Sequence, residues 1–185
     1  MDILGDFKTS LTKSLDEIDP AWKTYDGLIV AGTHTPKNVD ELLEKIKEVR
    51  ELNKPFLGIC FGFQLMLIEY ARNVLKVGAD TTEINPETPW PVFTKLDDTR
   101  VGAFPVKVNG ETRLESHWHN YAFNQQYISW FKDKFILVWS DGILEMATLR
   151  ANKHHLGVQF HPEYESSKEN PHPIIKEFLR VCSLG

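Results

Sequence analysis

Two short, continuous apolar runs constrain the fold of this chain more than any other feature. Residues 27–31 (Gly-Leu-Ile-Val-Ala) and 55–60 (Pro-Phe-Leu-Gly-Ile-Cys) each have the length of a strand. Such runs are typical of parallel strands that are buried on both faces. Apolar residues at helical spacing follow each run, over 39–52 and 64–75. The alternation predicts an α/β fold with a doubly wound, mostly parallel sheet and flanking helices.

The rest of the chain extends this pattern. We expect a strand at 2–4, a helix at 10–18 and a closing helix at 173–181. The polar, proline-containing segment 80–99 predicts a loop. An added antiparallel region follows, with a hairpin turn at Asn109-Gly110. After residue 99 we expect strands with short turns at 101–108, 111–119, 136–140, 146–150 and 156–160. The sequence contains no internal repeat or linker, so we expect residues 1–185 to form a single domain.

The composition argues against several classes of function. The formal net charge is −5, from 21 basic and 26 acidic side chains, and no long basic run appears, which disfavours nucleic-acid binding. The apolar runs are too short to cross a membrane, and the first residues do not resemble a targeting signal. Only two cysteines are present, too few for a disulfide framework. We therefore expect a cytoplasmic protein without nucleic-acid or membrane partners.

Cys60 lies where a predicted strand passes into a predicted helix, with Gly58 and Gly62 two residues away on each side. Glycines relieve the crowding of a tight nucleophile elbow, and a helix N-terminus favours a thiolate. The backbone N–H of Phe61 could then point at an oxyanion. The alternative is an inert, buried core cysteine, which is a common environment for this residue.

His161 follows the apolar segment 156–160, so it also lies at a predicted strand end. Glu163, two residues later, could hold the imidazole through Nδ1 and leave Nε2 to deprotonate Cys60. The alternative is a loop histidine beside a solvated carboxylate. One short chain therefore has two candidate catalytic residues that each follow a predicted strand. This coincidence favours a catalytic role for Cys60, His161 and Glu163.

The stretches 58–64 (Gly-Ile-Cys-Phe-Gly-Phe-Gln) and 157–163 (Gly-Val-Gln-Phe-His-Pro-Glu) resemble the two signatures of class I glutamine amidotransferases. Within that family, residues 25–185 are similar to the glutaminase domain of CTP synthase. The resemblance implies a flavodoxin-like fold and an amidohydrolase. Cys60 would attack the side-chain amide of glutamine or a γ-glutamyl relative, form a thioester and release ammonia.

The resemblance also implies the roles of the surrounding residues. Thr33 and Phe61 would form the oxyanion hole, and Glu83 would pair with the ammonium group of the substrate. We expect neither a cofactor nor a metal ion. The other substrate contacts implied are Gly32, Gln64, His119, Asn120 and Tyr121.

Three departures from the family pattern bear on function. Thr33 replaces a glycine of the oxyanion loop, and Asn120 replaces the arginine that clamps the α-carboxylate; Ser116 and Trp118 likewise stand where arginine is usual. The region before residue 26 is short, whereas a full domain of the family has an additional strand there. The synthase domain that would consume the ammonia is absent, which leaves open a separate synthase partner, as well as a homo-oligomer.

These departures leave three functions open. The chain could be a self-sufficient amidohydrolase acting on glutamine or on a relative without a free α-carboxylate. It could be a catalytically impaired binding or regulatory module, or a subunit that delivers ammonia to a separate synthase. The loop residue His34 is either a ligand-binding side chain or an exposed histidine. His117 and His119 share one face of a predicted strand, where structural or substrate contacts are favoured over metal binding. The intact set of Cys60, His161 and Glu163 favours the enzyme.

Overall fold

A mixed sheet forms the centre of the molecule. The structure, a computed structural model, describes residues 1–33 and 35–185, and six strands of this part build the sheet. Four are parallel, and the last two pair antiparallel at one edge. This arrangement confirms the predicted, mostly parallel sheet. The order across it is β1 (Asp2–Leu4), β2 (Leu28–Val30), β3 (Phe56–Ile59), β9 (His155–Val158), β8 (Ile143–Leu149) and β7 (Phe135–Ser140).

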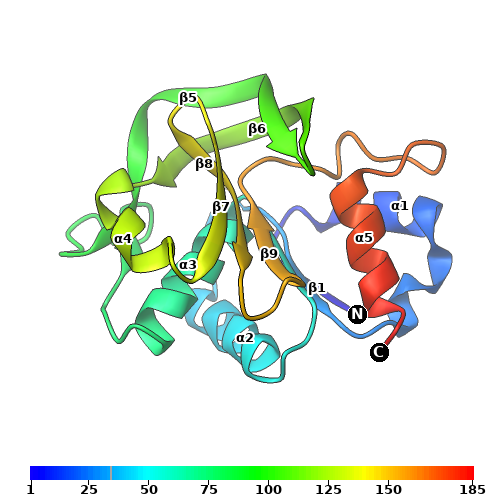
Figure 1. Cartoon of the computed structure of the whole chain (residues 1–185), viewed down its shortest axis with the longest axis horizontal. Coiled ribbons are helices and arrows are strands. Elements are labelled where there is room, and N and C mark those ends of the chain that lie inside the picture. Colours follow the sequence, from blue (N-terminus) through cyan, green and yellow to red (C-terminus); the bar gives the residue numbers. More distant parts are fainter. Residues whose placement is uncertain (34) are drawn as a thin grey trace.

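Helices cover both faces of this sheet (Figure 1). On one face lie α2 (Val39–Glu51) and α3 (Phe61–Asn73), and on the other α1 (Lys8–Ile18) and α5 (Pro173–Cys182). Successive strand residues alternate between the two cores: Val30 belongs to the first, and its neighbour Ile29 to the second. Both are fully buried, which explains why these strands are continuously apolar.

A second sheet contains β4 (Asp80–Thr81), β5 (Pro91–Val108) and β6 (Glu111–Phe123). The long β5–β6 hairpin arches over the central sheet (Figure 1). Its turn is Asn109-Gly110, with φ of 50° and 90°, which confirms the predicted hairpin. The backbone N–H of His161 donates to the Ser116 carbonyl of β6 over 2.8 Å. The hairpin therefore meets the chain just beyond the carboxyl end of β9.

The prediction of a loop over residues 80–99 is wrong. Half of β5 and all of β4 lie there, because Val92 and Phe93 are fully buried and pair with distant residues. Phe93 is the register partner of Phe123 and packs edge-to-face on Phe63, with ring centroids 5.7 Å apart. Pro91 is tolerated because it is the first residue of its strand.

Other boundaries differ less. The α3 helix begins at Phe61 rather than Gln64, directly after Cys60, and β6 continues four residues past the predicted end at 119. The short elements η1 (Pro20–Thr24), η2 (Gln125–Tyr127) and α4 (Ile128–Phe131) were not predicted. Within residues 1–33 and 35–185, no helix combines the length and apolar character needed to cross a bilayer.

Candidate active site

The backbone at Cys60 has the strained geometry expected of a nucleophile elbow. Cys60 caps α3 with φ 53° and ψ −104°, a conformation that a residue with a side chain rarely adopts. Its N–H donates to the Val158 carbonyl over 2.8 Å, which ties the elbow to β9. A Cβ on Gly58 would lie 2.6 Å from the Gly62 backbone, and one on Gly62 would lie 2.0 Å from the Val30 carbonyl oxygen. Both flanking glycines are therefore sterically required.

His161 and Glu163 lie beside this elbow. The Nδ1 atom of His161 is 2.8 Å from Glu163 Oε1, and both side chains are almost fully buried. Gly32 joins the two halves of the site, because a Cβ there would lie 3.2 Å from His161 Cε1 and 3.3 Å from Cys60 Cβ. The ring of Tyr164 stacks on His161 with centroids 5.0 Å apart, which fixes the orientation of the imidazole.

The protonation of His161 follows from these contacts. Burial alone would lower its pKa, but the Cys60 sulfur and the Glu163 carboxylate outweigh burial and raise the pKa to about 10. At neutral pH the imidazole therefore carries a proton, and its positive charge pairs with the Cys60 sulfur. Gln159 Nε2 donates a hydrogen bond to the same sulfur over 3.8 Å.

This pairing predicts how Cys60 reacts with iodoacetamide. At about pH 6.5, His161→Gln should slow alkylation of Cys60 roughly 10-fold or more, because the cation that stabilises the thiolate is lost. The rate is measured by peptide mass spectrometry after timed quenching. Burial raises the pKa of Cys182 to about 12, so Cys182 should stay unmodified and serves as the internal reference. Equal Cys60 rates in the two proteins would contradict the ion pair.

A small pocket, with a cavity volume of about 20 Å³, opens at the elbow. It brings together residues from the loop after β2, the start of α3, the segment after β4 and strand β6. Eight of the eleven candidate residues line it, and Gly32, His161 and Glu163 adjoin it through Cys60. Its lining residues are Thr33, Cys60, Phe61, Gln64, Glu83, Trp118, His119, Asn120 and Tyr121.

The loop at Gly32 and Thr33 is held by the N-terminal segment. The Gly32 carbonyl accepts hydrogen bonds from the backbone N–H groups of Asp6 and Phe7, at 3.3 and 3.1 Å. Because N–H and C=O point in opposite directions across a trans peptide, the Thr33 N–H points away from that segment. The Thr33 hydroxyl bonds to the Asp6 carboxylate and accepts from the N–H of Thr35. Hydrogen bonds therefore fix the loop at Thr33.

Two polar side chains in the pocket are suited to bind a ligand. Gln64 is 2% exposed, and its Oε1 has no hydrogen-bond partner among the described residues. Burial raises the pKa of Glu83 to about 7, so a nearby cation would strongly favour its charged form. The Glu83 backbone N–H donates to Thr81 Oγ1, which holds this segment at the end of β4.

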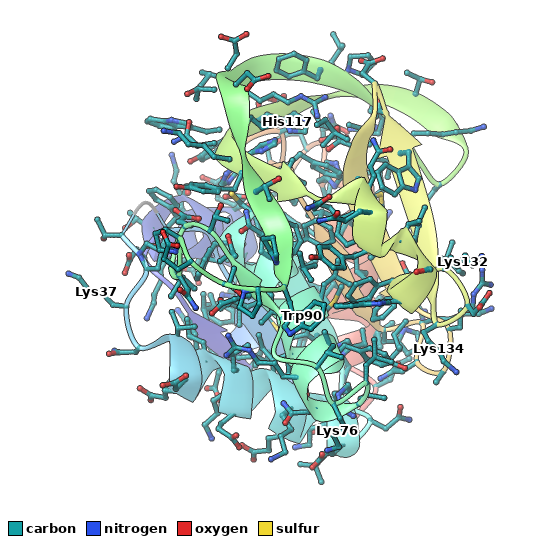
Figure 2. All side chains as sticks on the ribbon, turned by 90° about the vertical axis from the view of Figure 1, so that its left-hand side faces the viewer. Lys37, Lys76, Trp90, His117, Lys132 and Lys134 are labelled. Atoms are coloured by element: carbon teal, nitrogen blue, oxygen red, sulfur yellow. The ribbon has the colours of Figure 1, made fainter. Side chains whose placement is uncertain are left out.

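His119 enters the pocket as a neutral ring. Its Nδ1 donates to the Tyr121 carbonyl over 2.9 Å, and its Nε2 lies 3.3 Å from His117 Nδ1. Burial lowers the pKa of His119 to about 4 and that of His117 to about 3. The two rings share a face of β6, as predicted, and contact each other. His117 lies within the hairpin region in Figure 2.

Two residues near the thiol were not predicted from the sequence. Gln159 is fully buried beside Sγ, and the Trp118 carbonyl lies 3.9 Å from Sγ. The one signal for Gln159 was a polar residue within an apolar segment, and a backbone carbonyl leaves no signal in a sequence. The question raised for His34 falls on a residue outside those that the structure describes.

Comparison with known proteins identifies the family. The model of "Glutamine amidotransferase class-I" matches residues 7–181. This chain belongs to the class I glutamine amidotransferases. The resemblance predicted from segments 58–64 and 157–163 is thus confirmed.

Curated relatives of this glutamine amidotransferase include the CTP synthases of Sulfolobus acidocaldarius and Aeropyrum pernix. Each is 37% identical, and each match covers 95% of this chain but 37% of the relative. The chain thus spans little more than a third of the length of these relatives.

Solved structures confirm the fold. The Trypanosoma brucei CTPS glutaminase domain with bound acivicin matches 98% of this chain and 92% of that one, at 21% identity and a TM-score of 0.84. A putative GMP synthase subunit from Thermoplasma acidophilum matches 100% of this chain and 92% of that one, also at 21% identity, with a TM-score of 0.62. The predicted class I glutamine amidotransferase-like architecture is therefore correct.

Proposed function

We propose that this chain hydrolyses the side-chain amide of glutamine or a γ-glutamyl relative through a thioester at Cys60. The observation that carries the proposal is a cysteine on a strained elbow beside a buried His161–Glu163 pair, at the edge of a pocket. Family membership supports amide hydrolysis as the general reaction. We further propose that residues 1–185 act as one catalytic domain.

In the first half-reaction, the Cys60 thiolate adds to the amide carbon. The negative charge that develops on the amide oxygen would be met by the N–H groups of Thr33 and Phe61; the latter, as the first residue of α3, has no acceptor within its own helix. The His161 imidazolium gives its proton to the departing nitrogen. Ammonia leaves as the carbon–nitrogen bond breaks, and an acyl thioester remains on Cys60.

In the second half-reaction, neutral His161 takes a proton from water. The resulting hydroxide adds to the thioester carbon, and the carbon–sulfur bond breaks to return the Cys60 thiolate and His161 imidazolium. The product is the γ-carboxylic acid, which releases its remaining proton to solvent and leaves as the carboxylate. Glu163 holds the ring through Nδ1 during both proton transfers, so Nε2 remains directed at the reaction.

The pH profile of ammonia release tests this assignment. We expect kcat/KM to rise as pH passes through about 7, where Glu83 ionises, because charged Glu83 binds the substrate ammonium. It should fall as pH approaches about 10, where His161 loses the proton that the leaving group needs. Glu83→Gln should remove the rising limb and lower kcat/KM about 10- to 100-fold, the value of a hydrogen bond to a charged group.

The matched control is Glu87→Gln, an exposed acid four residues away that does not line the pocket. It should leave the profile unchanged. A rising limb that persists in Glu83→Gln would overturn the role of Glu83.

Two other functions are supported by specific observations. Delivery of ammonia to a separate synthase is favoured by the name and greater length of the CTP synthase relatives. Co-purification of a synthase with the chain would support it. A catalytically impaired binding or regulatory module is favoured by Asn120 at the position of the family's arginine. Stable binding of γ-glutamyl compounds without any ammonia release would support the module.

A further inference from the structure

The pocket contains one acidic side chain and no basic one among its described lining residues. Glu83 is the acid, and His119 is neutral at physiological pH because burial lowers its pKa to about 4. Figure 2 shows Lys37, Lys76, Lys132 and Lys134 projecting at the periphery of the molecule. A ligand that complements this pocket carries a positive charge and no negative one.

Arg100 of β5, the register partner of His119, is a buried cation near the pocket. Its Nη1 donates to Glu145 Oε1 over 2.5 Å, and its guanidinium lies over the Phe104 ring, 4.4 Å from the centroid. Arg100 is 8% exposed and does not line the pocket. Its Nη2 has no hydrogen-bond partner among the described residues, but because Arg100 lies outside the pocket lining it offers no paired hydrogen bonds to a carboxylate bound there.

The remaining polar groups favour an ammonium and a neutral carbonyl. Gln64 Oε1 is a buried acceptor that no described residue satisfies, and Glu83 is a carboxylate, so both suit an ammonium group. Asn120 Oδ1 accepts from the Thr99 hydroxyl over 2.5 Å, so the free atom of its amide is the nitrogen, a donor. An uncharged N–H donor can bond to a neutral carbonyl, but it lacks the positive charge that arginine offers to a carboxylate.

The same end of the pocket is open to solvent. Asn120 is exposed, and Trp118, another lining residue of the same strand, is 50% exposed. A group attached to the substrate's α-carbonyl would extend toward this exposed side, whereas the carboxamide would point inward to the buried Cys60.

We infer that the substrate is a glutamine residue with a free α-ammonium group and an α-carboxyl group blocked as an amide, as at the N-terminus of a peptide. This inference rests on the proposed hydrolysis at Cys60. The reaction joins one water to the side-chain carboxamide and yields a glutamate residue and ammonia, while the blocked α-carbonyl is unchanged.

The test compares three substrates, each with a single primary amide. They are L-glutamine, its α-methylamide, and the α-methylamide acetylated on nitrogen. We expect kcat/KM for ammonia release from the α-methylamide to exceed that from glutamine by about 10-fold or more. Acetylation should abolish most of this activity, because Glu83 loses its cationic partner.

Variants at Asn120 make the comparison sharper. Asn120→Arg should shift the preference about 10- to 100-fold toward glutamine, by supplying a charged fork for the carboxylate. Asn120→Gln, which stays uncharged, should keep the preference for the methylamide. His34→Ala is included because His34 follows Thr33 in the sequence. Loss of glutamine turnover in that variant would mean that the imidazole binds the substrate carboxylate. That result would overturn the inference.

The outcomes separate this inference from the proposed function. Ammonia release from glutamine that equals or exceeds release from the methylamide would overturn the substrate class and leave the amidohydrolase intact. A folded protein that releases ammonia from none of the three substrates would overturn both.

Discussion

Replacing Cys60 with serine is expected to reduce ammonia release by about 10⁴-fold or more, the scale seen when an enzyme loses its nucleophile. The hydroxyl oxygen that replaces sulfur is not ionised by a neighbouring imidazolium, so the covalent step loses its nucleophile. The fold should be unaffected, because the two side chains have nearly the same shape. The measurement is steady-state ammonia release, with thermal unfolding of the same preparation.

The matched control for this loss is Cys182→Ala. Cys182 is buried on α5 between the helix and Gly27, away from the pocket. We expect its removal to cost stability and leave kcat per folded molecule unchanged. If Cys60→Ser retained a tenth or more of the activity, the nucleophile would have to be another group.

Replacing Gly62 with alanine is expected to destabilise the protein by about 3 kcal/mol or more. In most helices this change is mildly stabilising, because glycine has the greater conformational freedom to lose. Here the new Cβ would lie 2.0 Å from the Val30 carbonyl oxygen and 2.8 Å from its carbon. These are backbone atoms of a central strand, so the start of α3 would have to move away from the sheet.

Gly78→Ala is the matched control for Gly62→Ala. A Cβ at Gly78 would meet only Trp90 Cδ1, at 3.7 Å, which is an ordinary contact. Its free energy of unfolding, measured by urea denaturation, should change by less than about 1 kcal/mol. Similar losses for both variants would show that helix-to-sheet contact at the elbow is looser than the geometry indicates. Because Cys60 sits on this elbow, Gly62→Ala should also impair catalysis in the fraction that remains folded.

The sequence predicted best where local pattern and tertiary environment agree. Residues 28–30 and 56–59 are apolar because both faces of their sheet are covered, so their burial could be inferred from composition alone. Asn109-Gly110 allowed the hairpin to be predicted because few residue pairs adopt its two positive φ angles.

Prediction from the sequence failed where contacts between distant residues decide the structure. Residues 91–99 have the composition of a loop, yet Phe93 is held by Phe63 and Phe123, which are 30 residues away on either side. No local pattern reports such contacts, so tertiary packing overrode the polar, proline-containing composition.

The candidate site divides in the same way. Cys60 and His161 could be predicted because each follows a strand, and parallel strands bring their carboxyl ends to one edge. The residues that support the pocket could not be predicted. Arg100 of β5 pairs with Glu145 of β8, and His117 of β6 lies 3.8 Å from the same carboxylate. The hairpin pairing of β5 with β6 was predicted, but the packing of β8 against the hairpin was not indicated by the sequence.

The measurement that tests the central claim most directly is the intact mass of the protein, quenched in acid within its first turnovers. A reactive γ-carboxamide substrate should add to Cys60 the mass of the substrate less one ammonia, and peptide mapping should place the adduct on that residue. The adduct should be absent from Cys60→Ser. Ammonia release with no adduct, or with an adduct on another residue, would contradict a thioester at the elbow.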